Sequence, residues 1–154
     1  MRLFVILAIT TGARMGAILE LRWSQVDFMH RSINFNAPWH EQSNKRRAEV
    51  PINARAYEAL DEAARGALTD HVIEWDAKPM QSVKKAIRMA AVRSGVPCSS
   101  HVFRHTAGVW MAQADVPMQK ISQFLGHTST TVTERAYARY SPSFMKDAAA
   151  ALEF

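Results

Sequence analysis

The sequence predicts a mainly α-helical domain with one small antiparallel β-hairpin, an α+β architecture. Most segments place apolar residues at helical spacing, whereas one short region alternates apolar and polar residues. The chain has 154 residues, of which 48% are hydrophobic and 21% charged, as expected for a single globular domain with a genuine core. This composition excludes collagen-like, low-complexity and wholly disordered chains.

The first segment predicts a buried helix over residues 3–10. It ends at Thr11-Gly12, where glycine permits a left-handed turn, and a second helix follows with Arg14 at its entrance. The apolar run covers only seven residues, 3–9, and helical periodicity continues beyond it. We therefore expect neither a signal peptide nor a membrane span.

The β-hairpin is predicted between residues 32 and 52. Ile33 and Phe35 alternate with polar neighbours, and so do Val50 and Ile52 around Pro51. The polar stretch between these two short strands is rich in basic residues, so we expect an antiparallel hairpin with a basic loop.

The remaining two thirds of the chain predict further helices, separated by turns. Residues 69–79 are expected to form a connection with turns, Gly95-Val96-Pro97 ends one helix, and Gly126 ends another. Two helices are expected over 53–67 and 82–93. Four more should follow: one carrying His101 to Trp110, one from Asp115-Pro117 to Leu125, one opened by a Thr131 to Glu134 capping box, and one starting at Ser141-Pro142. Trp23, Trp39, Trp75 and Trp110 are expected to fill the core, together with the eight Met residues.

Charge and cysteine content indicate the kind of partner and the compartment. The formal net charge is +5 and the pI about 9.7, which favours a polyanionic partner such as nucleic acid. Cys98 is the single cysteine, so it cannot form an internal disulfide, and it lacks the companions of a zinc site. We therefore expect no metal, no cofactor, and a cytoplasmic location close to the nucleoid.

Four separated segments each present a group suited to binding phosphate. They are Arg14, the basic run from Lys45 to Arg47, His101 with Arg104, and His127 after Gly126. His101 and Arg104 are three residues apart, so a helix would project them from one face. Arginine matches phosphate geometry with forked donors and keeps its charge at working pH.

A fifth segment supplies a nucleophile, Tyr137, ten residues beyond His127. Nearby cations are expected to favour the phenolate and to stabilise the extra negative charge of a five-coordinate phosphorus transition state. A lysine on a hairpin could then act as general acid toward the departing sugar oxygen.

Several motifs occur in order: Thr11-Gly12-Ala13-Arg14 with Leu21-Arg22-Trp23, Val50-Pro51-Ile52, His101 to Thr106, Leu125-Gly126-His127, and Tyr137. Together they resemble the catalytic domain of tyrosine recombinases, the phage integrase family, over nearly the whole chain. The resemblance implies the tyrosine recombinase catalytic-domain fold and a site-specific recombinase that integrates or excises mobile DNA.

The resemblance also implies a role for each site residue. Arg14 and Arg104 would bind the scissile phosphate of double-stranded DNA, with His101 and His127 completing the pocket. Lys45 would be the general acid, and Tyr137 would attack to form a 3′-phosphotyrosyl link and a free 5′-hydroxyl. No nucleotide cofactor is needed, because the link keeps the energy of the broken bond.

The resemblance also implies parts of the assembly that lie beyond this chain. Relatives carry a DNA-clasping domain ahead of the catalytic one, so the chain is expected to be a catalytic-domain fragment. They act as tetramers on DNA and often exchange the C-terminal helix, which residues 141–154 could do here. Two positions depart from the pattern: Ala17 stands where relatives have an acidic residue, and Ser43 stands where they often place the lysine.

Other interpretations remain open from the sequence. The chain could be a non-catalytic helix-turn-helix regulator built on residues 121–140, or a recombinase-like fragment without activity. Tyr140 rivals Tyr137 as nucleophile, and His105 is expected to be a buried, hydrogen-bonded structural residue. Lys84, Lys85 and Arg88 form a basic helical face that either contacts phosphates or only keeps the protein soluble.

Overall fold

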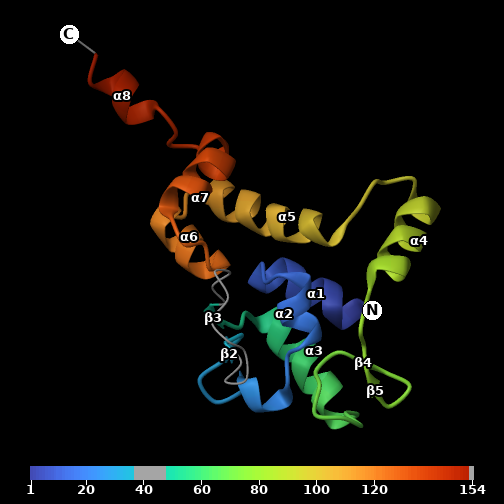
Figure 1. Ribbon diagram of the computed structural model, residues 1–154. Helices are drawn as coiled ribbons and strands as arrows, with labels where there is room; N and C mark the ends of the chain where they lie inside the picture. The colour runs from blue at the N-terminus through green and yellow to red at the C-terminus, as the bar shows by residue number, and fades with distance from the viewer. Residues whose placement is uncertain (37–47, 153–154) are drawn as a thin grey trace.

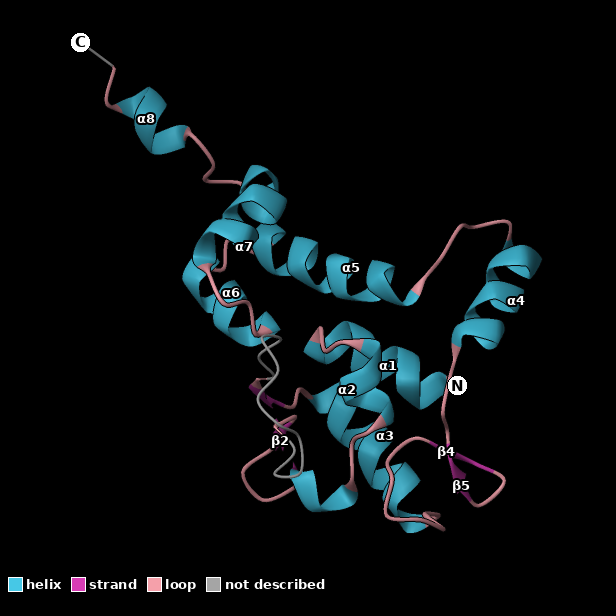
Figure 2. Cartoon of the chain, in the orientation of Figure 1, coloured by secondary structure: helices cyan, strands magenta, loops and turns pink. Residues whose placement is uncertain are grey.

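The computed structural model describes residues 1–36 and 48–152, and helices dominate this part of the chain (Figures 1 and 2). The α-helices are α1 (Arg2–Thr11), α2 (Met15–Leu19), α3 (Ala54–Arg65), α4 (Lys84–Ser94), α5 (Ser100–Gln113), α6 (Met118–Leu125), α7 (Thr130–Tyr137) and α8 (Lys146–Ala150). The strands are β1 (Val26–Asp27), β2 (Ser32–Asn34), β3 (Glu49–Pro51), β4 (Glu74–Trp75) and β5 (Lys78–Pro79). Two short 3₁₀ helices, η1 (Trp23–Gln25) and η2 (Ala138–Tyr140), complete the set. The predicted α+β class is confirmed.

The larger core lies around α1. Phe4 and Leu7 of this helix are buried and pack with residues of α2, α3 and the small sheet. Asn53 begins α3 as its N-cap, and its side chain accepts a hydrogen bond from the Ala56 amide. Leu60 then turns into the core from the apolar face of that helix. This half of the molecule therefore supports the segment that carries Arg14.

The predicted hairpin forms, and it gains a third strand that sequence patterning did not indicate. The sheet has the antiparallel order β1-β2-β3, with Ile33 opposite both Val26 and Val50. These three side chains face the core, while Asn34 and Glu49 are exposed, as alternation requires. Residues 69–79 also contain the short β4–β5 pair, where only turns were expected. Strands of two residues are too short to produce a periodic signal.

A second, smaller core joins α5, α6 and α7. Ala112, Ile121, Leu125 and Tyr137 are buried together there. The two cores meet where α5 passes over α1 (Figure 1). Gly12 lies at this junction with φ +59, and a Cβ on it would lie 2.4 Å from Leu125 Cδ2. Both the left-handed backbone and the close approach of α6 require glycine at this position.

Two predicted helix starts were wrong. Ser129, not Thr131, is the N-cap of α7, and its side chain accepts a hydrogen bond from the Thr131 amide. The last helix begins at Lys146 instead of Ser141. Ser141 and Ser143 donate hydrogen bonds to the Asp115 carboxylate at the end of α5, which holds that stretch out of helical conformation.

The expectation that tryptophan and methionine fill the core was largely wrong. Trp75 is 74% exposed, Trp110 is 57% exposed and Met29 is 87% exposed. Trp23 packs against the larger core, and Trp39 lies outside the described residues. Composition alone does not indicate which large side chains a small, divided core can cover.

Two helices lie at the edges of the molecule (Figure 1). In α4, Ile87 is buried while Lys84, Lys85 and Arg88 are exposed. The short α8 extends away beyond η2. Within residues 1–36 and 48–152, no helix has the length and apolar character needed to cross a membrane.

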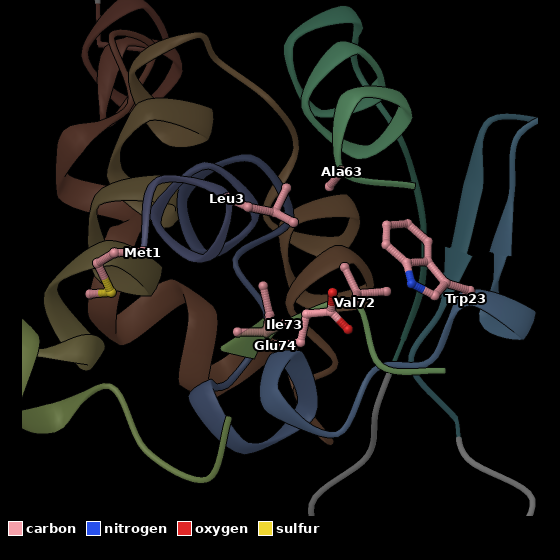
Figure 3. A pocket seen from close by; sticks show the side chains of 7 residues that line it. All are labelled: Met1, Leu3, Trp23, Ala63, Val72, Ile73 and Glu74. Atoms are coloured by element: carbon pink, nitrogen blue, oxygen red, sulfur yellow. The ribbon is translucent and has the colours of Figure 1, made fainter. Parts of the chain in front are cut away.

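A small cavity of about 150 Å³ lies beside α1 (Figure 3). It is lined by Met1, Leu3, Trp23, Ala63, Val72, Ile73 and Glu74. None of the residues predicted to bind phosphate lines this cavity, so it is separate from the site described below.

Candidate active site

Arg104 occupies the centre of the candidate site, on the face of α5 that crosses α1. Its Nη1 donates a hydrogen bond of 2.7 Å to the carbonyl oxygen of Gly12, so one side of the guanidinium is fixed by the turn after α1. Its Nη2 is buried and has no hydrogen-bond partner among the described residues. Burial, and next the positive charge of Arg14, lower the pKa of Arg104 to about 10. A buried donor of this kind is prepared to bind an anion.

Arg14 comes from the opposite half of the molecule, two residues after Gly12. It is the N-cap of α2, with extended backbone at φ −69 and ψ 147, and its side chain is half-buried. Its charge lowers the pKa of both Arg104 and His127, so the three side chains lie close enough to repel one another. The turn at Gly12 therefore both anchors Arg104 and delivers Arg14.

His127 follows Gly126, whose left-handed backbone at φ 66 ends α6. A hydrogen bond of 2.8 Å joins His127 Nδ1 and Thr133 Oγ1, and Thr133 is fully buried on α7. Burial, followed by the charges of Arg104 and Arg14, lowers the pKa of His127 to about 4. The ring is consequently neutral at neutral pH.

Tyr137 lies in the smaller core, with 5% of its surface exposed. Its ring covers Gly108 of α5, where an added Cβ would lie 2.4 Å from Tyr137 Cζ. Burial raises the pKa of Tyr137, although the charge of Arg104 acts in the opposite direction. The expectation that nearby cations favour the phenolate is therefore wrong for this state, because desolvation outweighs the attraction of Arg104.

Four segments thus bring two guanidinium groups, one imidazole and one phenol to one place. The mutual repulsion among Arg14, Arg104 and His127 would be relieved by a bound anion, which would raise the pKa of His127 and Arg104 again. No group of three or more metal-binding side chains occurs in the part of the chain that the structure describes. The chemistry available to the described side chains is anion binding with an adjacent oxygen nucleophile.

The sequence pattern of the phage integrase family matches residues 1–143. The chain belongs to the phage integrase family. Three curated proteins are similar to it in sequence. It is 28% identical over 148 residues to tyrosine recombinase XerC of Bifidobacterium longum (strain DJO10A), covering 81% of this chain and 39% of that protein. It is 27% identical to the integrase of Salmonella phage P22, over 91% of this chain and 39% of that protein, and 24% identical to transposase A from transposon Tn554 of Staphylococcus aureus, over 95% and 45%.

Solved structures of integrase-family proteins share this fold. The Tn1549 transposon integrase in complex with a circular intermediate DNA superposes with a TM-score of 0.79 at 18% identity, over 96% of this chain and 57% of that one. The XerA recombinase gives 0.76 at 20% identity, over 97% and 56%. The catalytic domain of bacteriophage HP1 integrase gives 0.67 at 22% identity, over 96% and 79%. The present chain thus spans about two fifths of the length of the XerC and P22 proteins.

For two predicted site residues of this integrase-family chain, His101 and Lys45, the described residues show no contact that would test their assignment. His101 is exposed in the first turn of α5. Within the described residues, no hydrogen bond or ion pair connects it to Arg104 or His127. Lys45 lies outside the described residues. Ala17, which stands where the resemblance implies an acidic residue, is buried in α2.

The expectation that His105 is a buried structural residue was wrong. His105 is exposed, and its ring is near two tyrosine rings, with centroids 5.4 Å from Tyr137 and 6.3 Å from Tyr140. The Tyr140 hydroxyl accepts a hydrogen bond of 3.1 Å from Arg139 Nη2, and it lies on η2 beyond the end of α7. Only Tyr137 of these two tyrosines is electrostatically linked to Arg104.

The lowered pKa of His127 predicts a specific pH dependence of stability. The unfolded chain binds a proton at this ring near pH 6.5, but the folded chain does so only near pH 4. Protonation therefore favours unfolding, and the free energy of unfolding should fall as pH drops from about 6.5 to about 4. His127→Gln should remove this part of the fall, measured by urea unfolding of both chains at pH 7.5, 6, 5 and 4. Equal pH slopes in the two chains would contradict the assignment.

Proposed function

We propose that this chain is the catalytic domain of a site-specific DNA recombinase or integrase. In this proposal Tyr137 cleaves a DNA strand by attacking one backbone phosphate, and the reverse attack rejoins strands. The observation that carries the proposal is the meeting of Arg14, Arg104 and His127 beside Tyr137, from segments as far apart as residues 14 and 137. A regulator that only binds DNA has no need for a phenol next to this cluster.

Arg104 and Arg14 bind the scissile phosphate in this mechanism. Arg104 Nη2 is the donor best prepared for it, because it is buried and unpartnered among the described residues while Nη1 is held by Gly12. Arginine keeps its charge when it is half-buried, and two guanidinium groups stabilise the charge that develops on a five-coordinate phosphorus. His101, at the start of α5, and His127 complete the pocket.

The chemical step exchanges one phosphoester for another. The Tyr137 oxygen forms a bond to phosphorus and gives up its proton to a water molecule, while the bond from phosphorus to the 5′ oxygen breaks. Lys45, in the predicted hairpin loop, supplies the proton that converts the departing oxygen to a 5′-hydroxyl. The 3′-phosphotyrosyl link has the energy of the original ester, so rejoining requires no nucleotide cofactor.

Two exposed regions fit double-stranded DNA and a second subunit. Lys84, Lys85 and Arg88 are exposed on α4 and contribute positive charge, and such charges bind phosphates without reading sequence. The helix α8 lies away from the body, and Phe144 and Leu152, which flank it in the sequence, are exposed. We propose that it packs against a neighbouring subunit of a tetramer on DNA.

A randomised library of labelled, nicked DNA duplexes tests the proposal without knowledge of the target site. A cleaved strand loses its short 5′-hydroxyl fragment from the nick, so the reverse reaction is prevented and a covalent adduct accumulates. The expected result is an adduct that survives denaturation, whose proteolytic peptide carries the DNA on Tyr137. Sequencing the captured DNA then gives the preferred site.

The other readings of the sequence predict different results in this experiment. A helix-turn-helix regulator, formed by α6 and α7 across Gly126, would enrich bound sequences without any adduct. An inactive recombinase-like fragment would also enrich bound sequences without forming an adduct. The variant to examine would then be Ala17→Asp, which introduces the acidic residue that the resemblance implies. A longer form of the protein, with the DNA-clasping domain that the resemblance implies, controls for weak binding by the catalytic domain.

Thr133 is expected to position His127. If the Thr133 hydroxyl donates to Nδ1, then Nε2 carries the proton and can donate to a phosphate oxygen. Thr133→Val keeps the side-chain shape but removes the hydroxyl, so adduct formation at saturating DNA should slow about tenfold, with little change in DNA affinity. Thr133→Ser keeps the hydroxyl and should restore most of the rate. Equal rates in the valine and serine variants would show that the hydrogen bond has no such role.

A further inference from the structure

Gly108 lies in the middle of α5, where a glycine costs helix stability. In a helix interior it is about 1 kcal/mol less favourable than alanine. Here the space that a side chain would need is taken by Tyr137. A Cβ on Gly108 would lie 2.4, 2.5 and 2.9 Å from Cζ, Cε1 and Cε2 of that ring. These distances are well below any normal contact, so Gly108 is the residue that admits the ring.

His105 forms a second wall beside the same ring. It precedes Gly108 by three residues on α5, so both lie on one side of the helix. The His105 and Tyr137 rings are 5.4 Å apart and tilted by 34°. The atoms nearest to Gly108 include Cζ, which bears the reacting oxygen. The contact with Gly108 therefore lies at the hydroxyl end of the Tyr137 side chain, which is the reactive end.

Arg104 lies one helical turn before Gly108 on the same helix. A ring held over Gly108 consequently has a fixed relation to the guanidinium, and the charge of Arg104 does act on Tyr137. The anchor of Arg104 on Gly12 fixes the other side of this arrangement. The nucleophile and the phosphate-binding group are thus both positioned by α5, although Tyr137 belongs to α7.

We propose that Gly108 and His105 form a seat for Tyr137, and that this seat positions the nucleophile beside Arg104 for strand cleavage. The cleavage part rests on the proposed function, whereas the seat itself does not. Gly108 and His105 are both positioning residues, since they act through Tyr137 and not on the DNA. A side chain at position 108 would displace the phenol while leaving Arg14, Arg104 and His127 in place.

Stability measurements test the seat without any activity. Gly108→Ala should destabilise the wild-type chain, because overpacking outweighs the better helix propensity of alanine. In the Tyr137→Ala chain, where the ring is absent, the same substitution should stabilise. Gly66→Ala is the matched control, since nothing lies within 4 Å of its added Cβ, and its effect should be the same in both backgrounds. An effect of Gly108→Ala with the same sign in both backgrounds would overturn the seat.

The position of the phenol is tested by labelling the tyrosine Cζ carbons with ¹³C. The chain has three tyrosines, so the Tyr137 signal is identified by its loss in Tyr137→Phe. In wild type it should titrate above the ordinary tyrosine range, and in Gly108→Ala its titration should move down toward that range. His105→Ala, an exposed substitution that leaves the core intact, should give a smaller shift in the same direction. An unchanged Tyr137 titration in Gly108→Ala would overturn the proposal.

The positioning role is tested with the nicked DNA substrate. Gly108→Ala should slow adduct formation roughly 100-fold at saturating DNA, the cost of a nucleophile misplaced by about 1 Å, with unchanged DNA affinity. If Gly108→Ala formed the adduct as fast as wild type or faster, the positioning role would be refuted, because the seat would then hold Tyr137 back instead of aligning it. Absence of any adduct with wild type would refute the proposed function instead, and the stability and titration results would still decide the seat.

Discussion

Replacing Tyr137 with phenylalanine is expected to abolish the covalent protein–DNA adduct. The substitution removes one oxygen and keeps the ring that fills the space over Gly108. Folding and DNA binding should therefore be unchanged, while the side chain loses the only atom able to attack phosphorus. Adduct formation on the nicked substrate should fall below detection, measured by denaturing gel after prolonged incubation.

Tyr140→Phe is the matched control for this substitution. Tyr140 is half-exposed on η2, and its hydroxyl bonds to Arg139, so its loss should leave adduct formation close to wild type. Adducts that persist in Tyr137→Phe and disappear in Tyr140→Phe would assign the nucleophile to Tyr140. Both chains should melt at nearly the same temperature as wild type, which excludes unfolding as the cause of a lost adduct.

Substitution of Arg104 should give the next largest loss. In Arg104→Ala both the phosphate contact of Nη2 and the bond from Nη1 to Gly12 disappear. We expect adduct formation to fall by about 1,000-fold, the upper range for removal of one donor that stabilises transition-state charge. Arg104→Lys should recover only part of the rate, because an ammonium group cannot hold Gly12 and grip a phosphate with a rigid fork.

Arg88→Ala is the control for the Arg104 substitutions, because it removes one positive charge without changing the candidate site. Arg88 is exposed on α4, so its removal should weaken DNA binding modestly and should leave the cleavage rate at saturating DNA unchanged. Arg104→Lys must also retain the wild-type thermal unfolding profile within a few degrees. A lysine variant as active as wild type would contradict the role assigned to the guanidinium.

Local sequence signals were sufficient for most of the elements. Apolar periodicity gave the helices, alternation around Ile33 and Val50 gave the hairpin, and Gly12 and Gly126 ended α1 and α6 as expected. These features depend on neighbouring residues and therefore can be read from short windows. The meeting of Arg14 with Arg104 is different, since nothing local links two residues ninety positions apart, and only the family resemblance implied it.

Several features that the sequence did not reveal depend on distant packing. Thr133 and Gly108 carry no motif of their own, and their importance appears only when α7 lies against His127 and α5. The pKa of Tyr137 was expected to fall because its basic neighbours could be counted, whereas burial cannot be counted from a sequence. The late start of α8 likewise depends on Asp115, 31 residues before Lys146.

The contact of Asp115 with Ser141 and Ser143 has a mechanical consequence. It fastens the chain to the end of α5 only a few residues after Tyr137, before the chain continues outward to α8. A force applied to the outlying C-terminal helix reaches this fastening first, and α5 bears the load instead of the phenol. A change in the direction of the tail should therefore be taken up beyond Ser143, so that the aromatic ring keeps its alignment.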